Sequence, residues 1–142
     1  MASPRPPVTL EMEWEGGLRF RGRAGTREMR LDGDSGSAVS PVEALVLALG
    51  GCMASDVVHI LVKGRADVKG LTARLAAERA PEDPRRLVKV DLRFAVQGPV
   101  PADKVERAIA LSRDRYCSVW HSLRPDIAFT TSFEAGASAP RR

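Results

Sequence analysis

The chain has 142 residues, of which 44% are hydrophobic and 28% charged, and its formal net charge is +4. This length and apolar content predict one domain with a core of its own. The mild charge and the single tyrosine exclude a basic, aromatic surface for nucleic acid. The N-terminus MASPRPPVTL lacks an apolar signal region, so we expect a cytoplasmic protein.

The predicted domain covers residues 8–134. The flanking segments 1–7 and 135–142 are rich in Pro, Ala, Ser and Arg, and we expect both to be disordered. Within the domain, polarity first alternates every second residue in three segments: 8–14, 18–23 and 27–31. Gly16-Gly17 supplies the first turn. These segments predict a three-stranded antiparallel meander, which a loop over residues 32–38 connects to the next element.

A long apolar helix is predicted over residues 40–63. Ser40 followed by Pro41, with Glu43 three residues after the serine, forms a capping box with proline at the first helical position. Residues 44–53 are apolar or glycine on every side, so protein should surround this half. The helix would measure ~36 Å, longer than a compact domain of this size is wide. We therefore expect a buried central helix that protrudes or is shared with a second copy of the chain.

A membrane span is the alternative interpretation of the same segment. Gly50, Gly51, Asp56 and His59 interrupt the apolar run before it reaches the ~20 residues that a span requires, so we expect no membrane partner. Each glycine costs roughly 1 kcal/mol in mid-helix relative to alanine. Their presence indicates that another backbone packs closely beside Cys52, and a second copy of this helix would fit.

The remainder of the domain is predicted to hold three strands and one more helix. The strand-like segments are residues 71–78, 87–96 and 126–134. Pro101 opens a helix that extends to Arg115, and residues 117–123 lead into the last strand. The resulting order, βββ-α-ββ-α-β with antiparallel strands, is an α+β fold.

The two cysteines are Cys52 in the long helix and Cys117 after the second helix. A free cysteine is usually a small apolar core residue, and each could be no more than that. In a reducing compartment, two cysteines are more often reactive or buried than permanently joined. A thiolate that attacks a peroxide becomes a sulfenic acid, and a second thiol can condense with it to a disulfide. This cycle requires two cysteines and neither a metal nor another cofactor.

A zinc site is the rival interpretation. The spacings Cys52-x6-His59 and Cys117-x3-His121 provide two cysteines and two histidines, enough for tetrahedral coordination. The second pair spans one helical turn, which is geometrically feasible. Zinc modules, however, carry knuckles such as Cys-x2-Cys in small domains, and a full core makes a structural metal unnecessary. We therefore expect no metal.

Two motifs resemble the OsmC/Ohr family, the osmotically inducible and organic hydroperoxide resistance proteins. SPVEALVLALGGCMASDVVHIL resembles the family's central-helix signature, and RDRYCSVWHSL resembles its second cysteine motif. The Ser-Pro-x-Glu start resembles the less characterised branch. The resemblance implies an OsmC-like, intertwined α+β homodimer. It also implies that Cys52 attacks the peroxide and that Cys117 resolves the sulfenic acid.

The family's active site also uses an arginine from the N-terminal strands and a glutamate near the start of the central helix. Any of three arginines on one predicted strand face could be the first: Arg19, Arg21 or Arg23. Glu43 matches the second, although the capping box already explains it. The helix dipole has faded about three turns from the N-terminus, so an arginine must stabilise the Cys52 thiolate. Three residues are expected to form an apolar lining for alkyl peroxides: Leu45, Leu49 and Trp120.

The resemblance thus implies a thiol-dependent peroxidase of oxidative-stress defence that reduces organic hydroperoxides and is regenerated by an external dithiol. The alternative is a stress-related protein of the same fold that binds a small apolar or thiol-reactive ligand without turnover. On a continuous helix, Glu43 and Cys52 lie ~13 Å apart along the axis and cannot meet within one subunit. If Glu43 takes part in catalysis, we expect it to belong to the other subunit's site.

Overall fold

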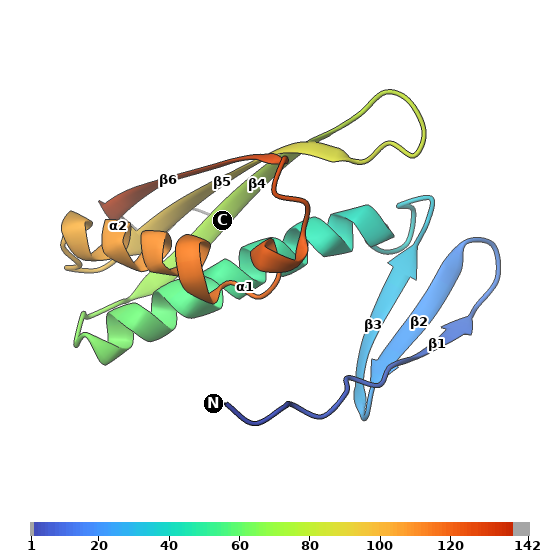
Figure 1. The fold of residues 1–142 in the computed structure, drawn as a ribbon, viewed down its shortest axis with the longest axis horizontal. Coiled ribbons are helices and arrows are strands. Elements are labelled where there is room, and N and C mark those ends of the chain that lie inside the picture. The colour runs from blue at the N-terminus through green and yellow to red at the C-terminus, as the bar shows by residue number, and fades with distance from the viewer. Residues whose placement is uncertain (1, 138–142) are drawn as a thin grey trace. The chain divides into compact units, whose positions relative to one another are not determined.

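A computed structural model describes residues 2–137 of the chain. Its elements follow the order β1-β2-β3-α1-β4-β5-α2-η1-η2-β6 (Figure 1). The chain divides into two compact units, Met1–Leu45 and Val46–Arg142. Of the C-terminal segment expected to be disordered, residues 138–142 lie outside the described part. The mixture of helices and strands confirms the α+β prediction.

The first unit holds a three-stranded antiparallel meander, as predicted. Its strands are β1 (Glu11–Trp14), β2 (Arg19–Ala24) and β3 (Arg27–Asp32). Gly16 and Gly17 have φ angles of 99° and 56° in the first turn, a conformation that glycine adopts without a Cβ clash. The Trp14 indole closes this turn by donating to the Gly17 carbonyl at 2.9 Å.

The meander has no apolar core of its own. Among residues 2–45, Asp32 is the single buried residue, and the β1 side chain of Met12 is 62% exposed. One face of the sheet forms an open hollow of about 480 Å³ lined in part by Leu10, Met12, Met29 and Leu31. A sheet with an uncovered apolar face requires a further surface to pack on.

Asp32 organises the loop that leads from β3 to the long helix. Its carboxylate accepts the backbone N–H groups of Ser37 and Asp34 and the Ser37 hydroxyl, each at 2.9 Å. These bonds, the Ser37 N–H first, lower the pKa of Asp32 to about 2, so the carboxylate stays ionised and holds the loop at neutral pH.

The long helix α1 (Pro41–Lys63) begins with the predicted capping box. Ser40 Oγ accepts the Glu43 N–H at 3.1 Å, and Glu43 Oε1 accepts the Ser40 N–H at 2.9 Å. Ser35 Oγ adds a third bond by donating to Glu43 Oε1 at 2.6 Å. The helix continues without a break through Gly50 and Gly51.

The second unit is built on a three-stranded sheet that is not wholly antiparallel. Its strands are β4 (Gly70–Arg79), β5 (Leu87–Gln97) and β6 (Ala128–Ala137). β4 and β5 pair antiparallel, whereas β5 and β6 pair parallel, so the prediction of antiparallel strands throughout is wrong for this last pair. Parallel neighbours require a long crossover, and α2 (Ala102–Leu111) provides it between β5 and β6.

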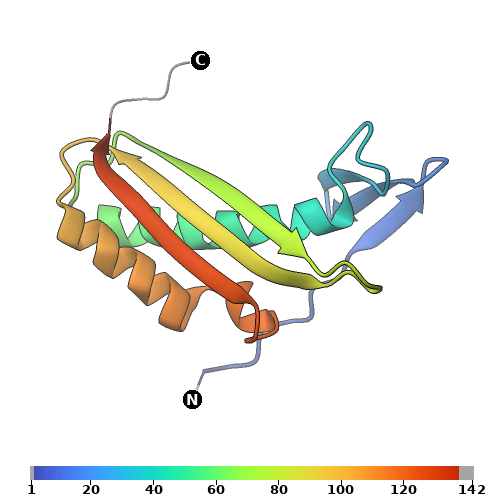
Figure 2. The same cartoon turned by 90° about the horizontal axis from the view of Figure 1, so that it is seen from above.

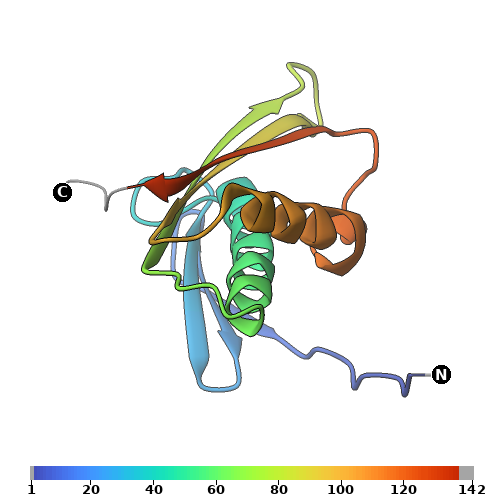
Figure 3. The ribbon, with the colours of Figure 1, turned by 90° about the vertical axis from the view of Figure 1, so that its left-hand side faces the viewer.

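Both long helices of the second unit cover the same face of this sheet (Figures 2 and 3). From α1, a stripe of residues spaced four apart is buried: Leu49, Met53, Val57 and Leu61. From β5, every second residue is buried: Val90, Leu92, Phe94 and Val96. These two rows form the hydrophobic core, in keeping with the predicted alternation of β5.

Within the single chain, protein covers α1 on one side only, so the expected enclosure of residues 44–53 is not complete without a second copy. Leu47 and Val62 are 56% and 58% exposed, because one sheet covers only one face of the helix. By length and apolar composition α1 would also be able to cross a membrane, although its buried stripe belongs to the core.

Within the single chain, Gly50 does not meet the expected backbone neighbour. A Cβ at Gly50 would meet the side chain of Leu75, not another backbone. A Cβ at Gly51 would have no described neighbour within 4 Å. Gly50 therefore provides room for a leucine of β4.

The second predicted helix changes form before Arg115. α2 ends at Leu111, and a π-helical turn, η1 (Ser112–Tyr116), follows it. A short 3₁₀ turn, η2 (Trp120–Ser122), comes next. Cys117 lies between these two turns, where the regular helix has already ended.

Candidate functional site

The second unit brings the two cysteines together. Cys52 is half-buried on α1, and Cys117 is fully buried directly after η1. The Cys52 side chain lies close enough to Cys117 to raise the pKa of the Cys117 thiol. The two thiols, far apart in the sequence, are therefore neighbours in the fold.

Cys117 is held as a neutral thiol. Burial, together with a smaller effect of the neighbouring Cys52 side chain, raises its pKa to about 11. The Trp120 N–H, which donates to Cys117 Sγ at 3.3 Å, acts in the opposite direction. The Trp120 ring packs on Phe129 with a centroid distance of 4.5 Å, which fixes the turn that carries this donor.

The three residues predicted to line the site take different positions. Trp120 is half-buried and contacts Cys117 through its backbone N–H. Leu49 is 1% exposed and belongs to the core. Leu45 is 40% exposed near the start of α1, at the end of the first unit. Trp120 is thus the residue of this set that the structure brings to the cysteine pair.

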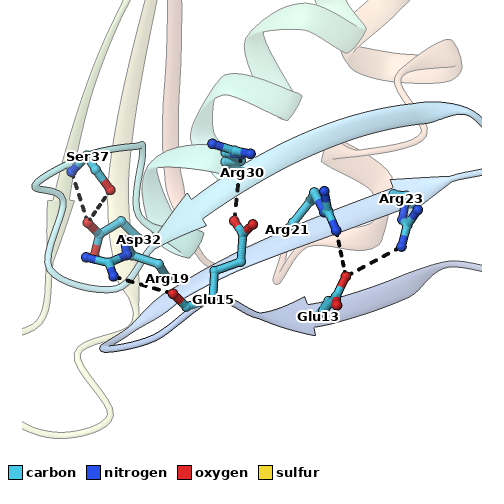
Figure 4. Close-up of polar contacts among 8 residues, drawn as sticks. All are labelled: Glu13, Glu15, Arg19, Arg21, Arg23, Arg30, Asp32 and Ser37. Carbon is cyan, nitrogen blue, oxygen red and sulfur yellow. Dashed lines mark hydrogen bonds and ion pairs between the residues drawn. The ribbon is translucent and has the colours of Figure 1, made fainter.

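The three candidate arginines lie on β2 among acidic residues of the first unit (Figure 4). Arg21 Nη2 pairs with Glu13 Oε2 at 2.7 Å, directly across the β1–β2 ladder, and Arg23 reaches the same oxygen at 3.5 Å. Arg19 Nη2 donates to the Glu15 carbonyl at 3.4 Å.

Arg21 differs from the other two arginines. Its Nε is buried and has no hydrogen-bond partner among the described residues. Its side chain is also less exposed than that of Arg23, at 27% against 41%. A buried donor without a partner is costly, so this N–H is an unsatisfied polar group among the described residues.

Glu43 is fully engaged at the start of α1. The Ser35 hydroxyl, followed by the Ser40 N–H, lowers the pKa of Glu43 and keeps it ionised. Because α1 is unbroken, Glu43 and Cys52 lie ~13 Å apart along its axis. The helix itself therefore does not bring this carboxylate to the thiol.

The two histidines take part in other contacts. His121 Nε2 lies 2.9 Å from the Arg113 carbonyl and must carry the proton that it donates. His59 is exposed and lines a groove on α1. Across residues 2–137, no three His, Cys, Asp or Glu side chains gather in a way that could hold a metal ion.

One polar contact beside the cysteines is not predicted from the sequence. Ser112 Oγ donates to Asp56 Oδ2 at 2.7 Å, and Asp56 also lines a groove of about 610 Å³ between α1 and α2. A signal was present, since Asp56 is an acid within an apolar helix, one turn after Cys52. Such a residue requires a partner.

The fold and the cysteine pair together define an α+β protein in which a long helix presents one thiol to a second, buried thiol. The profile of the family described as OsmC-like protein matches residues 33–132. The chain belongs to this OsmC-like family, which confirms the resemblance.

Three similar proteins illustrate this relationship. Protein YhfA of Escherichia coli K12 is 41% identical over 134 residues, covering 92% of this chain and 100% of YhfA. A hypothetical protein from Aquifex aeolicus superposes with a TM-score of 0.85 at 26% identity, covering 92% and 97% of the two chains. The organic hydroperoxide resistance protein OsmC from Legionella pneumophila gives a TM-score of 0.69 at 14% identity, covering 91% and 98%. This last likeness shows the fold alone.

Proposed function

We propose that this protein is a thiol-dependent peroxidase that reduces organic hydroperoxides. The observation that carries the proposal is the contact between half-buried Cys52 and buried Cys117. Family membership supports a stress-related role, and the Legionella protein of the same fold is named for organic hydroperoxide resistance. An external dithiol would regenerate the protein without a metal or other cofactor, in the cytoplasm.

The proposed cycle has three balanced steps. The Cys52 thiolate attacks the terminal peroxide oxygen, the O–O bond breaks, and the alkoxide leaves as the alcohol after taking a proton. Cys117 then attacks the sulfur of the Cys52 sulfenic acid, which forms the disulfide and releases water. A dithiol reduces this disulfide by exchange and becomes oxidised itself. Overall, one hydroperoxide and one dithiol give one alcohol, one water and one oxidised dithiol.

The proposal includes a homodimer with a shared site. The first unit has no apolar core, and Leu47 of α1 is exposed, so both surfaces are available to a second copy. A β2 arginine and Glu43 of one subunit would serve Cys52 of the other. Arg21 is the best candidate, because its buried Nε has no described partner and its guanidinium is already ordered by Glu13. A thiolate beside such a charge has a lower pKa.

The stoichiometry of peroxide consumption tests the proposed function. Reduced protein mixed with cumene hydroperoxide and excess dithiothreitol should consume many equivalents of peroxide, measured as loss of hydroperoxide over time. A binding protein of the same fold would consume at most about one equivalent, because nothing returns it to its starting state. A plateau at one equivalent with reductant still in excess would reject the peroxidase.

Arg21→Ala should slow sulfenic acid formation at Cys52 by about 10- to 100-fold at pH 7, since loss of a neighbouring positive charge raises a thiol pKa by about one to two units. Arg19→Ala and Arg23→Ala, on the same strand face, are the matched controls and should change the rate less than threefold or so. Stopped-flow measurement with limiting peroxide gives the rate constant. Equal effects of all three substitutions would remove the special role of Arg21.

Mixed dimers show whether the site is shared between subunits. A Cys52→Ser subunit combined with an Arg21→Ala subunit has one intact site if the arginine acts across the interface. The same combination has none if the arginine acts within its own chain. Recovery of activity on mixing the two inactive variants is therefore the expected result.

A further inference from the structure

Ser112 is the point where α2 gives way to the π-helical turn that precedes Cys117. Its side chain is fully buried, and its hydroxyl donates to Asp56 Oδ2 on α1 at 2.7 Å. Its backbone N–H bonds back to the carbonyls of Ala108 and Ile109 in α2. Its own carbonyl accepts the Cys117 N–H at 2.8 Å. One residue thus connects α2, α1 and the backbone of Cys117.

Asp56 places this connection next to the reactive pair. It follows Cys52 by one helical turn, so the two side chains project from the same face of α1. Asp56, one turn after Cys52 on α1, binds Ser112, and the Ser112 carbonyl binds the Cys117 N–H. The Cys117 thiol in turn lies next to the Cys52 thiol. These two hydrogen bonds together fix the position of Cys117 relative to Cys52 on α1.

The π-helical turn makes such a connection necessary. Ordinary α-helical bonding ends at Ser112, and π-turns occur as single irregular turns at functional sites. The Ser112–Asp56 bond is the side-chain hydrogen bond that joins this turn to α1 among the described residues. Without it, packing alone would hold the backbone of Cys117 beside the long helix.

We propose that Asp56 and Ser112 are positioning residues that hold Cys117 against Cys52 and thereby favour their disulfide. This inference rests on the proposed function only for the use of the disulfide in turnover. The bond itself can be tested without peroxide. A purely structural bond would instead affect the stability of the fold and leave the dithiol–disulfide equilibrium unchanged.

The test measures that equilibrium in the full-length protein. The Cys52 and Cys117 thiols together with oxidised dithiothreitol give the protein disulfide and reduced dithiothreitol. Alkylation of free thiols at several ratios of the two dithiothreitol forms yields the equilibrium constant. We expect Ser112→Ala and Asp56→Ala to lower it about tenfold, as the loss of one hydrogen bond to a charged group would.

Two further variants separate positioning from folding. Asp56→Asn retains an oxygen acceptor for the Ser112 hydroxyl and should restore the constant to within about twofold of the parent value. The double variant Asp56→Leu with Ser112→Ala leaves no buried polar group unpaired, so it should fold stably and still show the tenfold loss. Thermal unfolding of the reduced proteins is measured in parallel.

Ser55→Ala is the matched control. This serine precedes Asp56 on α1, but its hydroxyl donates to the Gly51 carbonyl of its own helix at 2.7 Å, so the equilibrium constant should not change. Parent-like constants in Ser112→Ala and in the double variant would overturn the positioning role. That result would not affect the proposal that the protein is a peroxidase. Conversely, a protein that does not turn over peroxide could still show the lowered equilibrium constants. The two proposals can therefore fail independently.

Discussion

Cys52→Ser should abolish the consumption of cumene hydroperoxide, whereas Cys117→Ser should consume a single equivalent and stop. Cys52 is half-buried and is the thiol proposed to attack the peroxide. A serine hydroxyl in its place would not carry out this attack. Cys117 is buried against it and would make the second bond. The measurement is peroxide consumed per subunit with a bulky dithiol as reductant, followed by mass spectrometry of the trapped sulfenic acid.

The second step should depend on pH in a defined direction. Because burial raises the pKa of Cys117 to about 11, the neutral thiol predominates below that pH and the attacking thiolate is scarce. Closure of the disulfide should therefore accelerate about tenfold for each pH unit between pH 7 and 10. Trp120, whose N–H donates to Cys117 Sγ, offers a fluorescence signal for this step. Parent-like turnover in Cys52→Ser, or pH-independent closure, would contradict the assignments.

Met12→Glu should disrupt a dimer that the unaltered chain forms at micromolar concentration. Met12 lies on the uncovered apolar face of the first sheet, beside Leu10 and Met29. If a second copy covers this face, the new carboxylate loses its water without gaining a partner, and the dissociation constant should rise at least ~100-fold. Sedimentation velocity over a concentration series measures the change.

Thr26→Glu is the control for this substitution. It adds the same charge to the exposed turn between β2 and β3, at a residue that does not line the apolar hollow, and should leave the dimer intact. Loss of the dimer should also destabilise the first sheet, since obligate partners share their stability. A well-folded monomer of the unaltered chain at micromolar concentration would contradict the shared-site proposal as well.

Local signals were sufficient for the elements themselves. The Ser40–Glu43 capping box, the turn at Gly16-Gly17 and the alternation along β5 are short-range patterns, and all three are present in the structure. Such features depend on neighbours within a few residues, so one sequence contains the necessary information.

The pairing of segments that are distant in the sequence was harder to predict from the sequence. The parallel pairing of β5 with β6 follows from the crossover through α2, while a polarity pattern looks the same in parallel and antiparallel edge strands. The glycines of α1 indicated a close neighbour, but only the packed fold shows that Gly50 faces Leu75 of β4.

The sequence by itself determined the long helix with its cap, the meander, the family motifs and the two cysteines. The tertiary structure alone decided that Cys117 is buried against Cys52, that Ser112 connects it to Asp56, and which arginine has a buried donor without a described partner. The physical reason is that burial and hydrogen bonding at a thiol depend on groups brought together from remote parts of the chain. A linear pattern records the chemistry of each group but not its surroundings.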